Sequence, residues 1–458
     1  MTPAPLDIPS ATNVCLDPPQ ASRRVTLRVA AFLPAKGSSQ RVPNKNTMLL
    51  DGEPLFLRSL KKLAACPSVD EVWLDTESDE IIRLASEVKC RVLRRDPALA
   101  SNKTDGHQLF LNEVLHCEAD ICVQLLCTSP FLKPATIEKA IEILRTDDRY
   151  DSVVAVRKEK QYRWANGRPC YDINHIPNSV DLEDEVIESM GLYAVRREAA
   201  LATKRRIGDR PYLLEIDPIE SVDVNWPVDF EMANLIAIGL REQERRLFAN
   251  LKLQLSSPLL SDVMDDLGVS GVLSREFQLN LPDERILGRA KTLQIDLCSD
   301  DEDFRKIYDS LNLYDHVVSN DVIVVANHAP GFAFFGELNA NLAVRAGAVG
   351  AVIDGVTRDW ADTHRMGFPV FAKGHHCKDT RKRGIVTSRN KTVVIDGVSV
   401  HKDDLVFGDC DGVVVIPKKH EAAILQEALR RKGNEAGILL AIAQGIRTDE
   451  LVRKFGLF

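Results

Sequence analysis

Between Val25 and about Asn250, short aliphatic runs alternate with segments of helical spacing. Strands are predicted at VTLRVAAFLPA, VDEVWLDT, CRVLRR, DICVQLLCT and SVVAV, and helices at PLFLRSLKKLAA and SDEIIRLASEV, the second of which opens on a capping Ser. This alternation predicts an α/β domain with a mostly parallel sheet. Such sheets bind ligands beyond the carboxyl ends of their strands, and the polar loop KGSSQRVPNKN directly follows the first strand.

The pattern changes after a long helical run, DFEMANLIAIGLREQERRLFANL. From about Leu255, Gly and Asp turn signals separate the aliphatic runs DVIVVAN, AVGAVIDG, TVVIDGV and DGVVVIP. SDVMDDLG opens with a Ser that predicts a helix cap, and the end of the chain is helical. We therefore expect a flexible tail over residues 1–25, a first domain over 26–250 and a layered α/β domain over 251–458.

Length and composition fit this division. A chain of 458 residues with 45% hydrophobic residues predicts two or three soluble domains, and no apolar run reaches the roughly 18 residues that cross a bilayer. Lys and Arg number 59 against 67 Asp and Glu, a net charge of −8, so nucleic acid and membrane are not expected partners. An anionic substrate must be held by a local basic cluster.

The cysteines and the N-terminal residues predict the compartment. Ten cysteines are scattered without a CxxC pair, which argues against a zinc ribbon or a redox motif and predicts reduced, mostly buried thiols. The first 24 residues lack the apolar run of a signal peptide. Both observations favour a cytoplasmic protein.

The loop after the first strand is the first candidate site. Lys36, Arg41 and Lys45 fall within ten residues, and backbone N–H groups near Gly37 and Ser38 can cradle phosphate oxygens. By composition alone, a basic surface loop without a ligand is an equally good interpretation, and the Walker A pattern is absent.

The surrounding strings decide between these readings. LPAKGSSQRVPNKNTMLLDGEPL, RRDPALASNKTDG, LLCTSPFLKPATI and ESVDVNWPVDF occur in order. Over about 220 residues they resemble the acylneuraminate cytidylyltransferases, which make CMP-sialic acid and related CMP-sugars. The resemblance implies a Rossmann-like nucleotidyltransferase fold with helices on both faces of the sheet. It also implies transfer of CMP from CTP to a 2-keto-3-deoxy sugar acid, with release of pyrophosphate.

The resemblance also assigns residues. Lys36, Arg41 and Lys45 take the positions of the basic residues at the triphosphate, and Asp223 that of the first Asp of a pair that binds Mg²⁺ (or Mn²⁺). Asn225 replaces the second Asp and is at best a neutral metal ligand. The implied nucleotide-binding set is Ala35, Lys36, Gly37, Ser38, Lys45, Arg95 and Ser101.

Several positions depart from the family pattern. Leu126 and Cys127 replace a Gln and a Pro, and Met190 replaces an Asn before Gly. Together with Asn225, they leave open a degenerate, non-catalytic domain, although altered sugar specificity is the simpler account because the basic loop and Asp223 are kept.

The second candidate site follows an aliphatic strand of the C-terminal half. Arg358 can grip a carboxylate with two parallel hydrogen bonds, and the Asp359 carboxylate suits Mg²⁺ or Mn²⁺. Backbone N–H groups of Gly336, Glu337 and Leu338 can serve the same carboxylate. Taken alone, the Arg-Asp pair is more simply a surface ion pair.

Here too the strings are specific. LSDVMDDLG, ILGRAKT, GELNANLAVRAGAVGAVIDGVTRD, GFPVFAKG and GVSVHKDDLVFGDCDGVVVIP occur in order. From Leu255 onward they resemble the family that joins the regulator of ribonuclease E activity to the metal-dependent hydroxymethyl-oxoglutarate (pyruvate) aldolases. The resemblance implies an RraA-like, swivelling α/β fold. It is less specific for function, because some members are aldolases and the bacterial regulator is a binding protein.

The aldolase residues that the resemblance assigns are present. Arg358 would bind the pyruvate carboxylate together with Gly336 and Leu338, Asp359 would anchor the metal, and Glu337 would be the acidic residue of the loop. Less securely, Glu435 matches a Glu that a neighbouring subunit contributes.

Other polar residues receive structural roles. A metal enolate needs no Schiff base, so Lys291 and Lys373 need no catalytic role. His364, His375 and His376 lack a carboxylate motif and are interpreted as surface or loop residues. Gly412 is expected in a turn capped by Asp409 and Asp411.

The joint hypothesis is a bifunctional, cytoplasmic homo-oligomer, a trimer or a dimer of trimers. One domain would use CTP and a sugar acid, and the other would act as an aldolase on pyruvate or a 2-oxo acid of the same class. The alternative is that one domain is silent and the C-terminal domain is an oligomerisation or regulatory module.

Overall fold

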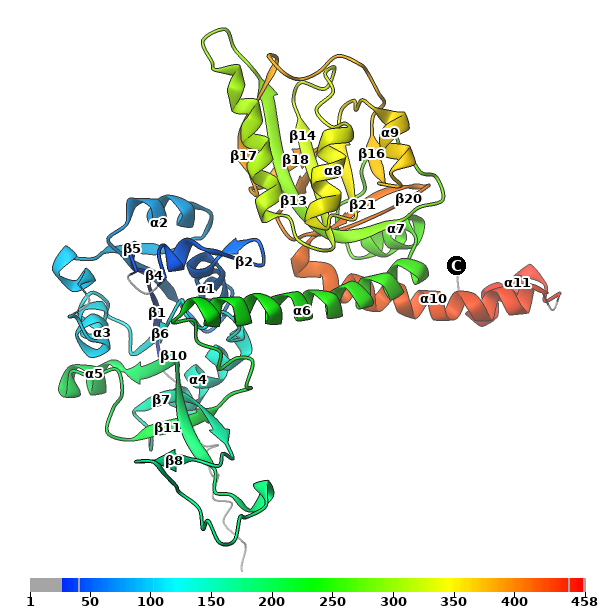
Figure 1. The fold of residues 1–458 in the computed structure, drawn as a ribbon. Helices are drawn as coiled ribbons and strands as arrows, with labels where there is room; N and C mark the ends of the chain where they lie inside the picture. Colours follow the sequence, from blue (N-terminus) through cyan, green and yellow to red (C-terminus); the bar gives the residue numbers. More distant parts are fainter. Residues whose placement is uncertain (1–26, 40–41, 102, 444, 456–458) are drawn as a thin grey trace, which may run out of the picture.

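The computed structural model describes residues 27–39, 42–101, 103–443 and 445–455 (Figure 1). The expected tail over 1–25 and the candidate site residue Arg41 lie outside the described residues. No helix in the described part of the chain is long and apolar enough to cross a membrane.

The first domain is built on a seven-stranded sheet in the order β11-β7-β10-β6-β1-β4-β5. Parallel pairs join β5, β4, β1 and β6, whereas β10 runs antiparallel to both β6 and β7. The expected mostly parallel sheet is confirmed. The strands are β1 (Val29–Pro34), β4 (Glu71–Thr76), β5 (Arg91–Arg94), β6 (Ile121–Leu125), β7 (Ser152–Glu159), β10 (Glu185–Arg196) and β11 (Pro211–Glu215).

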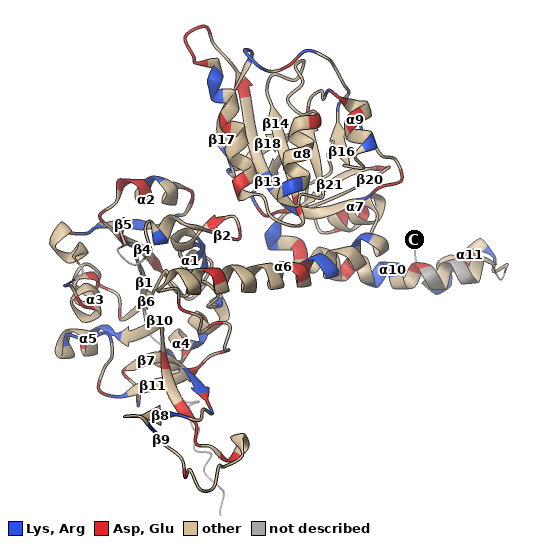
Figure 2. Cartoon of the chain, in the orientation of Figure 1, with Lys and Arg blue, Asp and Glu red and all other residues tan. Residues whose placement is uncertain are grey.

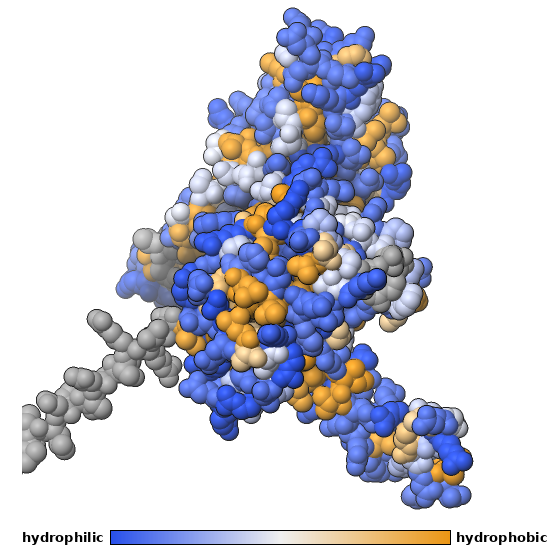
Figure 3. Space-filling model, turned by 90° about the vertical axis from the view of Figure 1, so that its left-hand side faces the viewer, coloured by the Kyte–Doolittle hydropathy of each residue, from blue (hydrophilic) through white to orange (hydrophobic). Residues whose placement is uncertain are grey.

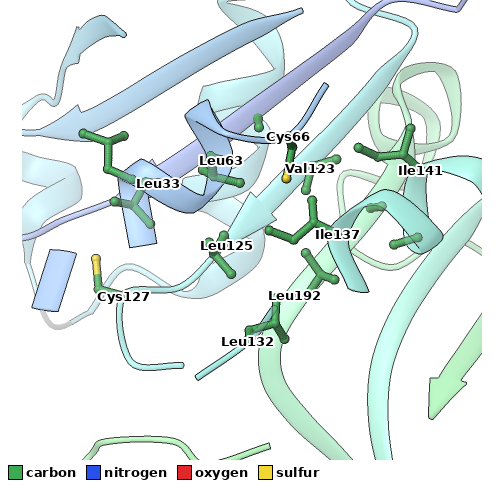
Figure 4. Packing of buried hydrophobic residues seen from close by; sticks show 14 of the residues in the cluster. Leu33, Leu63, Cys66, Val123, Leu125, Cys127, Leu132, Ile137, Ile141 and Leu192 are labelled. Carbon is green, nitrogen blue, oxygen red and sulfur yellow. The ribbon is translucent and has the colours of Figure 1, made fainter. Parts of the chain in front are cut away.

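Helices cover both faces of this sheet, as expected. Their bounds are α1 (Leu55–Ala64), α2 (Asp79–Leu84), α3 (Gly106–Leu115), α4 (Pro134–Thr146) and α5 (Arg197–Thr203). One core packs α1 and α4 on the sheet, and Figure 4 shows Leu63, Ile137 and Ile141 facing Val123 and Leu125. The other core joins α3 and α5 to the opposite face. Each fully buried aliphatic side chain contributes about 1.5–3 kcal/mol.

Two small hairpins project from this domain. β2 (Leu49–Leu50) pairs with β3 (Glu53–Pro54), and β8 (Trp164–Ala165) pairs with β9 (Arg168–Pro169). Short 3₁₀ segments, η1 (Lys45–Thr47), η2 (Ala85–Glu87), η3 (Pro97–Ala100) and η4 (Ser179–Asp181), complete the domain.

A single long helix, α6 (Pro227–Gln254), leads from the first half of the chain to the second (Figure 1). Its 28 residues span about 42 Å at the α-helical rise. Phe230 and Ala233 pack in the first domain, whereas Phe248 and Leu251 pack with residues after 255. The domain boundary near residue 250, which stays a prediction, falls within this helix.

The second half contains an eight-stranded sheet in the order β12-β16-β15-β14-β13-β20-β21, with β17 also paired to β13. β13, β14, β15 and β16 are parallel, and the remaining pairs are antiparallel. The strands are β12 (Gln278–Leu279), β13 (Ile286–Leu297), β14 (Asp321–Asn327), β15 (Gly350–Asp354), β16 (Val370–Ala372), β17 (Gly384–Arg389), β20 (Leu405–Asp409) and β21 (Gly412–Ile416).

This sheet carries a different layer on each face, which confirms the layered α/β expectation. One core joins it to η5 (Phe304–His316), α8 (Glu337–Ala346) and the segment around α9 (Trp360–Arg365). The other core includes the hairpin of β18 (Val393–Ile395) and β19 (Val398–Val400). α6, α7 (Ser257–Asp266) and α10 (Glu421–Ala443) pack together near β20 and β21, and η6 (Lys418–His420) and α11 (Thr448–Phe455) flank α10.

Two local predictions need correction. The cap of α7 is Ser256, whose Oγ accepts from Leu259 N at 3.4 Å, so the predicted cap in SDVMDDLG is wrong. Asp409 does cap its turn through Asp411 N at 3.1 Å, but it also accepts from Ser257 Oγ at 2.6 Å and thereby fixes the start of α7. Gly412 has a φ of +152° in that turn.

The described cysteines are all free, which agrees with the prediction of thiols. Their burial is less general than expected. Cys66, Cys117, Cys122 and Cys127 are buried, whereas Cys170, Cys377 and Cys410 are exposed.

Hydrophobic patches remain on the surface (Figure 3). On α6, the side chains of Val228, Met232, Leu235 and Ile238 are 53–69% exposed and recur at helical spacing. Residues 228–238 of α6 therefore form a solvent-exposed apolar stripe.

Candidate functional site

The loop after β1 lies at the carboxyl ends of β1 and β4, as predicted. Ala35 N donates to Asp75 O at 2.8 Å, and Gly37 N donates to Glu77 Oε1 at 2.7 Å. A Cβ at Gly37 would lie 2.7 Å from Ser78 Cβ, so only glycine fits this close approach. The amide that the sequence assigned to phosphate therefore donates to a protein carboxylate in this structure, and its role in phosphate binding stays a prediction. Lys36 and Ser38 lie beside it in the same loop.

The structure brings Lys45 to the segment that contains Asp223. Lys45 is 8% exposed, and its Nζ donates to Val224 O at 2.9 Å. Val224 N in turn donates to Thr128 O at 2.8 Å, just beyond β6. Residues 179 positions apart in the chain thus meet at the carboxyl edge of the sheet.

Asp223 fits the divalent metal that the resemblance implies. Its Oδ1 is buried and has no hydrogen-bond partner among the residues that the structure describes, while its Oδ2 accepts from the side-chain amide of Asn225. Among the described residues, no three His, Cys, Asp or Glu side chains form a metal-binding group. Mg²⁺ is commonly held by one or two carboxylates together with substrate phosphates and water, and the Asp223 carboxylate is a ligand of that kind. Asp223 would hold it, and Asn225 orients that carboxylate.

The remaining nucleotide-site residues have other contacts. Arg95 is 4% exposed and donates to Asp75 Oδ1 at 2.9 Å and to Asp75 O at 2.8 Å, so its guanidinium ties β5 to β4. Ser101 is exposed, and its Oγ lies 3.3 Å from Thr104 Oγ1. Their assignment to the cytidine pocket stays a prediction.

A buried carboxyl group behind Arg95 escaped the sequence analysis. Glu113 is fully buried and accepts from Gln124 Nε2 at 2.6 Å. Burial and the neighbouring Asp75 raise the pKa of Glu113 well above its usual value. A protonated Glu113 can donate a hydrogen bond to Asp75. Glu113 would then help to fix the Asp75 carboxylate that accepts from Arg95. The sequence offers no signal for this pair.

A cavity of about 300 Å³ adjoins Asp223. Arg157 from β7 and Glu188 and Met190 from β10 line it together with Asp223. Arg157 is the one cation of its lining and was missed, because a basic residue in the run VRKEK has no distinguishing sequence signal.

The positions that depart from the family pattern are structurally accommodated. Cys127 is buried, its Sγ donates to Pro34 O at 3.2 Å, and burial raises the pKa of its thiol to about 12. Met190 has a φ of +58°, a left-handed conformation that Asn adopts more readily than Met. Leu126 N donates to Gly191 O at 2.9 Å. Cys127 is thus an inert core residue, whereas Met190 changes a cavity wall.

In the second domain, Arg358 and Asp359 follow β15 and reach the start of α8. Arg358 Nη1 pairs with Asp379 Oδ2 at 2.6 Å, and Asp359 is the left-handed N-cap of α9, with a φ of +52°. A Cβ at Gly336 would lie 2.5 Å from Asp359 Oδ2 and 3.0 Å from Arg358 Cγ. The absence of a side chain at Gly336 therefore lets Arg358 and Asp359 approach the start of α8, and their convergence on one ligand stays a prediction.

The first turn of α8 supplies the predicted backbone donors. Glu337 N donates to Asp359 Oδ2 at 3.2 Å, and Leu338 follows within the first turn, where N–H groups have no partner inside the helix. The Glu337 side chain itself is exposed. Asp359 Oδ1 accepts no hydrogen bond from the described residues. One carboxylate oxygen thus remains to anchor a hydrated divalent metal, which fits the implied group.

A cavity of about 180 Å³ adjoins Arg358. Trp360 and His375 line it, with ring centroids 6.3 Å apart. His375 is exposed but belongs to the site, which refines its interpretation as a loop residue. Glu435 lies on α10, where it pairs with Lys432 at 2.9 Å, and none of the cavity residues comes from that helix. Its predicted role through a neighbouring subunit stays a prediction.

The other polar residues have structural partners. Lys291 is buried and pairs with Asp403 at 2.8 Å, and Lys373 pairs with Asp396 at 2.6 Å. His364 Nδ1 donates to Asn280 O at 2.9 Å. That neither lysine has a catalytic role stays a prediction.

Comparisons with known proteins agree with the two halves. Residues 30–228 match the Cytidylyltransferase family model, and residues 257–415 match the RraA-like (Aldolase/RraA) family model. The first half is 27% identical over 223 residues to N-acylneuraminate cytidylyltransferase A of Danio rerio, covering 46% of this chain and 51% of that protein. It is 28% identical over 228 residues to CMP-N,N'-diacetyllegionaminic acid synthase of Legionella pneumophila, covering 45% and 94% respectively.

The second half is 29% identical over 188 residues to a protein of Halalkalibacterium halodurans named "Putative 4-hydroxy-4-methyl-2-oxoglutarate aldolase", covering 41% of this chain and 84% of that protein. The chain spans about half the length of the Danio rerio relative. The chain thus carries a match to the cytidylyltransferase family over residues 30–228, followed by a match to the RraA-like family over residues 257–415.

Proposed function

We propose that the first domain transfers CMP from CTP to a 2-keto-3-deoxy sugar acid and releases pyrophosphate. The observation that carries this proposal is the meeting of Lys45 with the Asp223 segment at the carboxyl edge of the sheet. The anomeric hydroxyl would attack the α-phosphate of CTP. Such phosphoryl transfer depends on positioning and charge neutralisation.

The chain's own residues would divide this work. Lys36 and Lys45 would neutralise the phosphates, and Gly37 N would donate to a phosphate oxygen once Glu77 turns away. A divalent metal, when bound at Asp223, would supply further charge neutralisation. Arg157, in the cavity beside Asp223, would exchange its ion pair with Glu159 for the carboxylate of the sugar acid.

The test is an assay of pyrophosphate release and CMP-sugar formation from CTP, Mg²⁺ and a panel of 2-keto-3-deoxy sugar acids. Lys36→Ala should lower the rate at least tenfold, whereas Lys139→Ala, an exposed Lys on α4, should not. No product across the panel, with Lys36→Ala equal to the wild type, would contradict the proposal.

We propose further that the second domain is a metal-dependent aldolase that acts at a pyruvate unit. It is supported by the convergence of Arg358, Asp359 and the first turn of α8. Arg358 would exchange Asp379 for the pyruvate carboxylate, and the metal at Asp359 would stabilise the enolate. Sugar acids of the first reaction are formally pyruvate plus an aldehyde sugar, so both domains would serve one substrate class.

Pyruvate release from a 4-hydroxy-2-oxo acid should require a divalent metal and vanish in Asp359→Ala. Asp362→Ala changes another acidic residue of the same segment and should retain the activity. Equal rates in both variants would refute the assignment of Asp359.

A binding module is the second candidate function for this domain, and one observation favours it. Asp379 already neutralises Arg358. In that case, Arg358→Ala would leave all activities of the chain unchanged.

We also propose a homo-oligomer, a trimer or a dimer of trimers, in agreement with the apolar stripe on α6. Light scattering that shows a monomer would refute this assembly.

A further inference from the structure

A cavity of about 460 Å³ lies between the two domains, apart from both candidate active sites. α1, α6 and the β2–β3 hairpin form one side, and β13, the turn before β20 and η6 form the other. Figure 2 shows charged segments gathered where β2 and α6 approach the second domain. Its lining contains eight cations, Arg58, Lys61, Lys62, Arg241, Arg289, Lys291, Lys402 and Lys418, but only four carboxylates, Asp51, Glu53, Glu244 and Asp403.

Six of these cations are satisfied by carboxylates. Lys402 Nζ lies 2.8 Å from Glu53 Oε1, and Arg241 Nε lies 3.0 Å from Asp51 Oδ1. Carboxylates outside the lining, Glu87, Asp321 and Glu421, take up the remaining charge of Lys61, Lys291 and Arg289. These six cations therefore need no bound anion to neutralise their charge.

Lys62 and Lys418 are different. Neither has an ion pair with any described residue, and they face the cavity from opposite domains. The ammonium of Lys62 donates only to a neutral acceptor, the carbonyl of Pro130. Burial, together with the nearby Arg58, lowers the pKa of Lys62 to about 7 despite the carboxylates of Glu220 and Glu53. The charged form of Lys62 thus lacks the carboxylate partner that the six paired cations of the lining have.

We propose that this interdomain cavity binds a small phosphate-bearing anion between Lys62 and Lys418, with Arg58 and Arg289 beside it. A phosphate dianion supplies the negative charge that the half-buried ammonium of Lys62 lacks, and the exposed Lys418 can reach the same anion from the other domain. Its tetrahedral oxygens accept hydrogen bonds from several cations at once. The volume exceeds that of a single inorganic ion and admits pyrophosphate or a sugar phosphate.

Such a ligand would connect the domains next to the nucleotide loop. The β2–β3 hairpin, which contributes Asp51 and Glu53, begins two residues after η1 and its Lys45. The same hairpin contacts the second domain at Gly52 O, which accepts from His316 Nδ1 at 2.9 Å. An anion in the cavity would therefore hold both domains against one short hairpin.

Isothermal titration calorimetry of the full chain, with metal chelated, tests the proposal. The probes are inorganic phosphate, pyrophosphate and glucose 6-phosphate, which distinguish the free anion, the expected reaction product and a sugar phosphate. At least one should bind once per chain, and Lys62→Gln and Lys418→Gln should each weaken that binding at least tenfold. Lys419→Gln, a neighbouring exposed Lys outside the cavity, should leave the affinity within twofold.

Lys36→Ala separates this site from the nucleotide loop, because it should leave binding in the interdomain cavity intact. Binding that is lost in Lys36→Ala but kept in Lys62→Gln and Lys418→Gln would overturn the proposal. Absence of binding by all three probes at millimolar concentration would overturn it as well. Circular dichroism verifies that both cavity variants are folded.

Discussion

Replacing Glu53 by Gln removes a negative charge that binds a lysine from each of the two domains. Glu53 Oε1 accepts from Lys61 Nζ at 2.7 Å within the first domain and from Lys402 Nζ at 2.8 Å across the junction. The Lys402 side chain is only 11% exposed, so its charge would remain poorly solvated after the substitution. Glu53→Gln should therefore destabilise the junction.

The size of this destabilisation follows from the lowered pKa of Glu53. Burial raises the pKa of Glu53, but Lys402 and Lys61 outweigh it and lower the pKa from 4.5 to about 2. At about 1.4 kcal/mol for each tenfold change in the protonation equilibrium, the charge of Glu53 contributes about 3 kcal/mol at neutral pH. Because the pKa is lowered by folding, this contribution is complete above pH 4.5 and is lost as the pH falls toward 2. The difference between wild type and variant should shrink by about half between pH 5 and pH 3.

Urea denaturation followed by circular dichroism measures this difference in the free energy of unfolding. Glu87→Gln is a matched control, since Glu87 pairs with Lys61 at 2.6 Å but not with the second domain, and it should cost less than about 1 kcal/mol. A Glu53→Gln variant as stable as Glu87→Gln, or a difference that persists undiminished at pH 3, would refute the reasoning.

Three further substitutions probe particular close contacts. Gly336→Ala should lower metal-dependent pyruvate release at least tenfold with an unchanged melting temperature, because its Cβ would meet Asp359 Oδ2 at 2.5 Å; full activity would contradict this geometry. Lys45→Met should reduce CMP transfer about a hundredfold while the variant stays folded by circular dichroism, and a rate within twofold of wild type would exclude the role of its ammonium. Gly271→Ala should lower the free energy of unfolding of the second domain by about 2 kcal/mol in urea denaturation, since a Cβ would lie 2.0 Å from Val415 O. An unchanged midpoint would show that β21 can shift to accommodate the Cβ without cost.

The sequence placed the elements of both sheets well because strand and helix periodicity is local. It misplaced the cap of α7, since two serines stand five residues apart and the choice depends on Asp409, which binds Ser257 from the other end of the domain. Arg95 was likewise assigned from a motif alone. Its burial against Asp75 depends on the pairing of β4 with β5, which no local pattern reveals.

By itself, the sequence determined the two domain types, the order of their motifs and the identity of most candidate site residues. Lys36, Lys45, Asp223, Arg358 and Asp359 could all be named because each lies in a distinctive string. Only the tertiary structure decided which of them meet, as Lys45 does with Val224 O, and placed Arg157 in the cavity beside Asp223. It also decided the charge balance between the domains, because Glu53 and Lys402 are 349 residues apart and their contact depends on the path of the whole chain.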